Sequence, residues 1–188
     1  RYLPAFFFYS MGVQTIMLVA TSFGAKELKM ETSSLIQIIL IIQLVAIGGA
    51  TLMSKLSNKY GNIKVLALVV CIWIVVCIAA YFTTTSTQFY ILAIVVGLVM
   101  GGIQSLSRST YSKLIPQDIP DTASFFSFYD VTEKIAIVGG MFSFGLVDDL
   151  TNSMRNSALV LCVYFIAGLI LLISLIAYQK KNKQVDVA

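Results

Sequence analysis

Six apolar segments of roughly 20 residues, separated by short polar connections, constrain this chain more than any other feature of its sequence. A helix needs about 20 mostly apolar residues to cross the hydrocarbon core of a bilayer. Because lipid offers no hydrogen bonds to the backbone, each crossing segment must be a helix. The sequence therefore predicts an all-α membrane protein in which residues 1–188 form one bundle of six transmembrane helices. The segments lie near residues 3–25, 33–53, 63–82, 89–106, 123–147 and 157–178.

The composition argues against several other classes of protein. The chain is 58% hydrophobic and 12% charged, with a mean hydropathy of +0.88, whereas a soluble domain carries about 25% charged residues. It has no histidine, which removes histidine-based metal sites and histidine acid–base chemistry. Cys71, Cys77 and Cys162 lie inside apolar segments without CxxC spacing, so neither a zinc site nor a disulfide is indicated. We expect no enzyme activity, no metal and no cofactor.

The distribution of positive charge predicts the orientation in the membrane, because Lys and Arg collect in cytoplasmic connections. With alternating segments, the predicted cytoplasmic side collects most of the 13 basic residues. The other side has Lys26, Lys29 and Arg155, and Lys134 lies inside a segment. Both ends of the chain are therefore predicted to be cytoplasmic. No basic face alternates with aromatic residues, so the expected partner is the lipid bilayer and not nucleic acid. The basic residues on the cytoplasmic side are Arg1, Lys55, Lys59, Lys64, Arg108, Lys113, Lys180, Lys181 and Lys183.

Polar side chains are unevenly distributed among the six segments. The third and sixth segments carry almost none, whereas the first, second, fourth and fifth carry several. In the first segment, Ser10 and Gln14 are four residues apart and share a helix face. In the fourth, Gly101, Gln104 and Arg108 line up on one stripe. We interpret the four polar helices as lining an aqueous cavity that the other two brace, although Gln and Ser also form hydrogen bonds between helices in any membrane bundle.

The fifth segment contains the stretch "FFSFYDVTEKIAIVGG", in which Asp130, Glu133 and Lys134 fall within five positions of one another. Charged residues at the centre of a membrane helix cost about 2.5–3.5 kcal/mol each. At about 1.5 Å per residue, Lys134 lies about 18 Å from Thr122, near the middle of the membrane. Ser127 shares the same helix face. Ionisable residues at this depth usually mark a path for a solute or a proton.

A structural interpretation of this cluster competes with the functional one. Asp130 and Lys134 are four residues apart with the acid first, the favourable order for a helical ion pair. Glu133 is then left over, so it must be protonated, reach water or pair with another helix, where Arg108 is the nearest candidate. We favour a functional role in which neighbouring charges tune the protonation of the acids. The predicted substrate and proton residues are Asp130, Glu133, Lys134, Gln14, Gln104 and Ser127.

Small residues indicate where helices approach closely. Gly97 and Gly101 in the fourth segment, and Ala46 and Ala50 in the second, have the small-xxx-small spacing typical of tight helix packing in membranes. Gly139–Gly140 in the fifth segment is interpreted either as a bending point or as a packing notch.

Two groups of motifs resemble a known family. The stretch "SKLSNKYGNIKV" resembles the loop signature of the major facilitator superfamily, small-x-x-x-Asp-Arg-x-Gly-Arg-Arg, with Asn58 and Lys59 at the Asp-Arg positions and Gly61 at the glycine. The stretches "FYSMGVQTI", "GGIQSLSRSTYSKLIP" and "FFSFYDVTEKIAIVGG" are similar to the C-terminal half of the vacuole effluxer family within that superfamily. The resemblance covers essentially all 188 residues.

The resemblance implies one half of a twelve-helix transporter in the plasma membrane, or in the inner membrane of a bacterium. Its partners would be a missing N-terminal six-helix half and a small solute, with an amino acid or related zwitterion as the best candidate and a proton as a candidate coupling ion. Lys59, Gly61 and Arg108 would act as cytoplasmic latches. The family often has Asn-Asp where this chain has Ser10 and Met11, so coupling would be different or fall to Asp130 and Glu133. A membrane scaffold or receptor on the same fold is the alternative.

Overall fold

The computed structural model describes residues 2–115 and 122–185, with side chains described up to residue 180. Arg1, Pro116 and Pro120, together with the side chains of Lys181 and Lys183, lie outside the described residues. The described chain consists of six helices joined by short connections and contains no strand, so the predicted all-α class is confirmed. The helices are α1 (Tyr2–Glu27), α2 (Thr32–Tyr60), α3 (Asn62–Phe82), α4 (Ser86–Leu114), α5 (Thr122–Thr151) and α6 (Met154–Val185).

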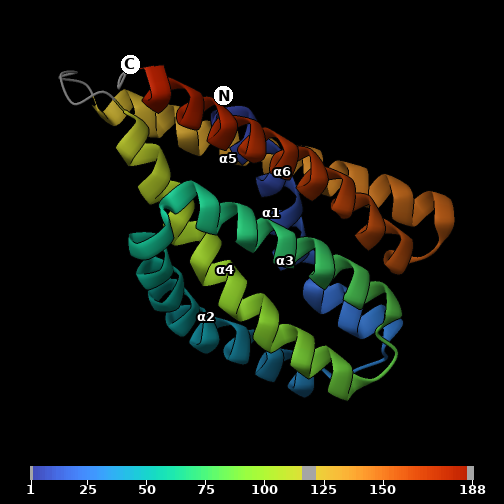
Figure 1. Ribbon diagram of the computed structural model, residues 1–188. Coiled ribbons are helices and arrows are strands. Elements are labelled where there is room, and N and C mark those ends of the chain that lie inside the picture. The colour runs from blue at the N-terminus through green and yellow to red at the C-terminus, as the bar shows by residue number, and fades with distance from the viewer. Residues whose placement is uncertain (1, 116–121, 186–188) are drawn as a thin grey trace.

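Successive helices run in alternating directions. Figure 1 shows the start of α1 and the end of α6 at the same end of the bundle as the turn between α2 and α3 and the end of α4. The α1–α2, α3–α4 and α5–α6 connections lie at the opposite end. The arrangement matches the alternation on which the predicted orientation was based.

Five helices, namely α1, α2, α3, α4 and α6, are long and apolar enough to cross a membrane. The remaining helix, α5, is 30 residues long. It carries the charges of Asp130, Glu133 and Lys134 in its first half and those of Asp148 and Asp149 near its end. These charges explain why α5 falls outside the group of five.

The helices extend beyond the apolar segments from which they were predicted. α2 continues to Tyr60 and α4 to Leu114, so most residues expected in the second and fourth connections are helical. Polar residues at a membrane surface do not end a helix, and the backbone ladder continues until a residue interrupts it. Gly61, with a φ of +89°, ends α2 and begins α3. At the other end of the bundle, Thr85 and Gln88 form a capping box that begins α4.

Glycines bring α2 and α4 together. A Cβ atom added at Gly97 would lie 2.9 Å from the carbonyl oxygen of Ile42, and Gly101 lies directly against the backbone of Ala46. From the other side, Gly49 of α2 packs on the backbone of Leu98. These contacts confirm the close approach predicted from the Gly97 and Gly101 spacing, since no larger side chain fits between the two backbones.

α1 lies at the centre of the bundle, where it packs against α5 and α6. A Cβ atom added at Gly140 of α5 would lie 2.5 Å from the carbonyl oxygen of Met11. This close approach supports the interpretation of the glycine pair as a packing notch, and α5 is continuous through it. On the far side, Phe165 of α6 packs on Gly12 and stacks on Trp73 of α3 with ring centroids 5.6 Å apart.

Ionic contacts fasten the end of the bundle that lies away from the chain termini. Glu27 of α1 forms a 2.9 Å ion pair with Arg155 of α6, whose guanidinium also donates to the carbonyl oxygen of Tyr81 at 2.9 Å. Lys26 and Asp148 form a second pair between α1 and α5 at 3.3 Å. Helices α1, α3, α5 and α6 are therefore linked at this end by polar contacts that segment prediction did not identify.

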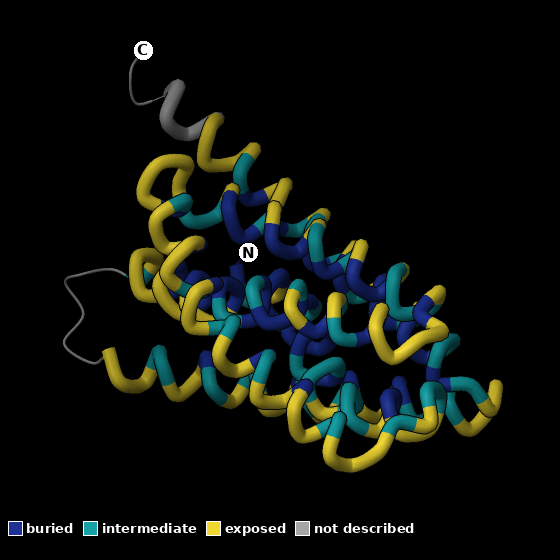
Figure 2. Tube along the Cα trace, turned by 90° about the horizontal axis from the view of Figure 1, so that it is seen from below, coloured by how far each residue is buried: buried dark blue, intermediate teal, exposed yellow. Residues whose placement is uncertain are grey.

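The buried residues concentrate along the middle of the bundle, and outward-facing turns are exposed (Figure 2). α2 and α5 contribute least to the interior, with five and four buried residues among those described. Both helices therefore carry broad apolar surfaces that the other five helices leave uncovered. The exposed large hydrophobic residues are Ile36, Ile39, Leu40, Leu44, Ile47, Leu52 and Tyr60 on α2, and Phe128, Val131, Ile135, Val138, Met141, Phe142, Leu146 and Leu150 on α5.

Candidate functional site

The fifth helix presents two different surfaces. At 100° per residue, Asp130, Lys134 and Met141 form one stripe, and Tyr129 and Ala136 lie on the side that packs into the bundle. Tyr129 is 5% exposed and Ala136 is fully buried, whereas Lys134 and Met141 are exposed. The charged stripe of α5 therefore faces out of the six-helix unit, and Glu133 lies at its edge toward α1.

Asp130 pairs with a helix other than its own. The guanidinium of Arg108, on α4, donates to Asp130 Oδ1 at 3.1 Å, and the two side chains are 60% and 50% exposed. The same guanidinium lies 5.8 Å from the centre of the Phe126 ring. The sequence offered Lys134 as the partner of Asp130 and Arg108 as a partner for Glu133, and neither pairing is formed. Arg108 pairs with Asp130, while Glu133 contacts Gln14 of α1.

Glu133 forms its contact with the first helix. Gln14 Nε2 donates to Glu133 Oε1 at 2.6 Å. Both residues line a cavity of about 20 Å³, to which Ser10 and Gln104 also contribute. A site of this size and polarity has room for about one water molecule. Three predicted site residues, Gln14, Gln104 and Glu133, are therefore brought together from three helices.

Lys134 has no partner within the described residues. Its side chain is exposed, and neither a salt bridge nor a hydrogen bond joins it to any described group. At the mid-membrane depth that the sequence predicts for Lys134, its charge would require water or an anion, because an unpaired charge in hydrocarbon is costly. Ser127, on the same face, donates to the Ala123 carbonyl of its own helix at 3.1 Å.

A buried hydroxyl network beneath the site was not predicted from the sequence. Tyr2 and Tyr9 of α1 lie 3.1 Å apart through their hydroxyl oxygens. Tyr2 donates to the carbonyl oxygen of Ser107 at 2.8 Å, and the hydroxyls of Tyr9 and Ser107 are 2.7 Å apart. The seven-residue spacing of the two tyrosines was the available signal, because it places them on one face of α1.

Aromatic rings support the charged stripe from behind. Phe6 stacks on Tyr129 with ring centroids 4.1 Å apart, and Tyr111 of α4 lies 5.0 Å from Tyr129. Tyr129 is adjacent in sequence to Asp130, so these contacts fix the rotation of α5 about its axis. The network and the rings together hold α1, α4 and α5 in register at the candidate site.

The predicted latch residues do not form one group. Lys59 lies over the ring of its neighbour Tyr60 at 5.3 Å, and Arg108 bonds to Asp130. The turn at Gly61 is joined to α4 through the next residue, Asn62, which donates to Ser109 Oγ at 3.1 Å. The contact between this turn and α4 is thus made by Asn62, which was not among the latch residues predicted from the loop signature.

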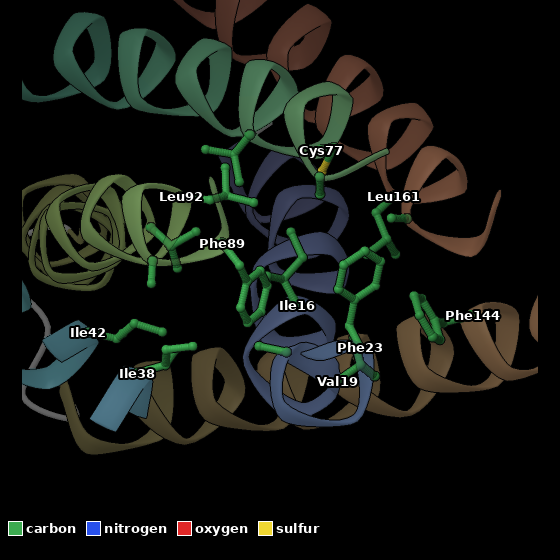
Figure 3. A pocket seen from close by; sticks show the side chains of 16 residues that line it. Ile16, Val19, Phe23, Ile38, Ile42, Cys77, Phe89, Leu92, Phe144 and Leu161 are labelled. Carbon is green, nitrogen blue, oxygen red and sulfur yellow. The ribbon is translucent and has the colours of Figure 1, made fainter. Parts of the chain in front are cut away.

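A second cavity, of about 60 Å³, lies at the centre of the bundle toward the opposite end from the termini. Figure 3 shows side chains from all six helices around it, including Ile16 and Phe23 of α1, Phe89 of α4 and Phe144 of α5. Its lining is entirely apolar, so it offers no hydrogen-bond partner to a charged or zwitterionic molecule. No group of three or more Cys, Asp or Glu side chains in the described part of the chain could hold a metal ion.

Comparison with known proteins gave a consistent result. Residues 1–186 match the family described as "Vacuole effluxer Atg22 like". The chain is 34% identical over 187 residues to "Uncharacterized MFS-type transporter YxiO" of Bacillus subtilis, covering 100% of this chain and 42% of that protein. It is 29% identical over 197 residues to "Autophagy-related protein 22" of Yarrowia lipolytica, covering 98% and 33%. The corresponding protein of Eremothecium gossypii is 30% identical over 182 residues, covering 89% and 35%. The chain thus spans about two fifths or less of the length of these curated relatives.

Proposed function

We propose, because this chain belongs to the vacuole effluxer Atg22-like family of the major facilitator superfamily, that it forms one half of a secondary transporter for a small zwitterion. Two six-helix units would rock around a central site and open it alternately to the two sides of the membrane. The names of the relatives, an effluxer family and an MFS-type transporter, support movement of a solute across the membrane.

The observation that carries this proposal is the exposed ammonium of Lys134, which has no partner among the described residues and lies beside two carboxylates in the sequence. A structural ion cluster would neutralise its charges within the bundle, as Arg108 does for Asp130. A solute site keeps one charge available for the ligand. Lys134 therefore suits a solute carboxylate, and Glu133 suits an ammonium group or a coupling proton.

The surrounding polar groups would orient the solute without adding net charge. The Gln14 amide already donates to Glu133 at 2.6 Å, and Gln104 lines the same small cavity. Both amides can also accept hydrogen bonds from an ammonium group. A zwitterion would thus meet a cation, an acid and two amides on α1, α4 and α5, which is the combination expected for an amino acid.

A second six-helix unit is proposed as the partner of this one. The uncovered apolar residues of α2 and α5, such as Leu44, Ile47, Val138 and Phe142, are 69–72% exposed. Lipid could cover these residues, but it could not solvate the charged stripe that runs beside them on α5. A partner unit leaving a wet gap at this stripe would satisfy both surfaces.

The orientation of the unit remains part of the proposal. Lys55, Lys59, Lys64, Lys113 and Lys180 all lie on helix segments at the end of the bundle that contains both chain termini. The excess of positive charge at this end supports a cytoplasmic location for both termini.

The proposal is tested by transport in proteoliposomes that contain the full-length protein, with a panel of radiolabelled amino acids as solutes. Lys134→Met is expected to slow transport about ten- to a hundredfold, because hydrogen bonds to charged groups contribute about 1.5–3 kcal/mol. Lys134→Arg keeps the charge and should retain most of the rate. Glu133→Gln is expected to remove or shift the pH dependence of transport.

Lys55→Met is the matched control, since Lys55 is also exposed and has no described partner but lies at the end of α2. It should transport at the wild-type rate. Normal rates and normal pH dependence in both Lys134→Met and Glu133→Gln would contradict the assignment of this site.

A further inference from the structure

A large pocket lies at the end of the bundle that contains the chain termini, far along the helices from the central apolar cavity. Its volume is about 740 Å³, within the range of small-molecule sites. The end of α2, the start of α3 and the ends of α4 and α6 line it. Its polar lining includes Tyr60, Asn62, Lys64, Lys113, Gln179 and Lys180.

The charge of this pocket is uncompensated within the described residues. Lys64, Lys113 and Lys180 all line it, no described carboxylate does, and none of the three takes part in a described salt bridge. Three lysines that converge from three helices without an acid create a strongly positive site.

One of these lysines is held in place. Lys113 Nζ donates to Asn62 Oδ1 at 3.1 Å, and Asn62 in turn donates to Ser109 Oγ at 3.1 Å. The chain Lys113–Asn62–Ser109 joins the turn after α2 to α4 and keeps one ammonium at the pocket wall. Two of the three donors of this ammonium are left for a ligand.

The pocket also has an apolar side. Ile63, Leu114 and Ile176 line it together with Tyr60, and Leu114 and Tyr60 are 41% and 55% exposed. Tyrosine and lysine at the end of a membrane helix are typical of the headgroup region of a bilayer. A ligand here would meet positive charge on one side and hydrocarbon-like surface on the other.

We propose that this pocket binds the phosphate-bearing headgroup of an anionic phospholipid from the adjacent leaflet. The lysines would contact the phosphate, and the apolar residues would contact the start of the acyl chains. Basic pockets between membrane helices recognise anionic headgroups in this way. The inference does not depend on the identity of the transported solute, because none of these residues belongs to the candidate solute site.

The test uses the full-length protein in nanodiscs, with phosphatidylglycerol and phosphatidylcholine as competing lipids. Native mass spectrometry counts the lipids retained on release from the disc. The pocket variant is Lys64→Gln/Lys113→Gln. The matched control is Lys55→Gln/Lys59→Gln, which removes the same charge at the same end of the bundle but from residues that do not line the pocket. Thermal unfolding of each variant establishes that it is folded.

A lysine whose ammonium directly contacts an anionic headgroup contributes about a fivefold preference for anionic lipid, and a lysine that does not reach the headgroup contributes less. We therefore expect the pocket variant to lose about 25-fold of its preference for phosphatidylglycerol over phosphatidylcholine, and the control to lose no more than about fivefold. Equal losses in both variants would overturn the proposal, because the preference would then reflect overall charge.

A competition experiment separates the lipid from a soluble phosphate compound. Glycerol phosphate lacks acyl chains, so an excess is expected to leave the retained phosphatidylglycerol in place. Displacement of the lipid by glycerol phosphate or inorganic phosphate at similar concentrations would identify a soluble anion as the ligand and would overturn the assignment to a phospholipid.

Discussion

At the scale of single residues, the distribution of charge on α5 is explained by two different kinds of contact. Asp130 is neutralised by Arg108 of α4, and Glu133 accepts a hydrogen bond from Gln14 of α1. Lys134 alone faces away from the described groups. The three charges are thus distributed among two helix contacts and one open surface, which is the arrangement expected if this surface borders water.

The coupling energy of the Arg108–Asp130 ion pair depends directly on whether the pair is surrounded by water or by packed side chains. Exposed ion pairs contribute about 0.2–1 kcal/mol, whereas breaking a dry, buried pair costs about 3–5 kcal/mol. Because the side chains are 60% and 50% exposed, we predict a coupling energy of about 1 kcal/mol or less. The measurement is a double-mutant cycle of Arg108→Gln and Asp130→Asn on the free energy of unfolding in bicelles. A coupling of several kcal/mol would indicate a dry pair.

The sequence predicted which residues would share one face of α5 but not how they pair. Helical periodicity identified one face of α5 that carries Ser127, Asp130 and Lys134, and the four-residue spacing identified Gln14. Helical periodicity predicts which way each side chain points around its own helix axis. It does not predict the axial position or the rotation of a neighbouring helix. The Arg108–Asp130 pair and the Tyr2–Tyr9–Ser107 network depend on those quantities, so they emerged only from the structure.

At the scale of helices, the close approach of α2 and α4 depends on the absence of side chains. We predict that Gly101→Ala lowers the free energy of unfolding by about 1–3 kcal/mol, because the added methyl group would separate the two backbones. Gly48→Ala is the control in the same pair of helices, since no atom lies within 4 Å of a Cβ added there. Thermal unfolding of both variants in detergent provides the comparison.

Equal melting temperatures for Gly101→Ala and Gly48→Ala would contradict the tight α2–α4 contact. The spacing of Gly97 and Gly101 predicted this contact, since small residues four apart form a groove on one helix face. The helix ends were less predictable. Hydropathy marks where a segment leaves hydrocarbon, whereas α2 and α4 continue into the polar region until Gly61 or the end of α4 at Leu114.

At the scale of the whole molecule, six alternating helices form a unit whose two ends differ chemically. One end is fastened by the Glu27–Arg155 and Lys26–Asp148 pairs, and the other carries the basic pocket and both termini. The number, order and direction of the helices followed from the six apolar segments. The sequence did not predict which helices would have uncovered apolar faces. Apolar residues look the same in a sequence whether they face lipid, a partner or the core.

Cysteine accessibility tests most directly whether the charged stripe of α5 borders water. Single cysteines are placed in the full-length protein after replacement of Cys71, Cys77 and Cys162, and are treated with a membrane-impermeant maleimide. We predict rapid labelling at Ser127, Asp130 and Met141. Phe128 is the control exposed on the apolar side of α5, and Ala136 is the control packed against the bundle. Both should stay unlabelled. If none of the three stripe positions is labelled in folded protein from either side of the membrane, the stripe is packed without water, and this result would contradict a solute path.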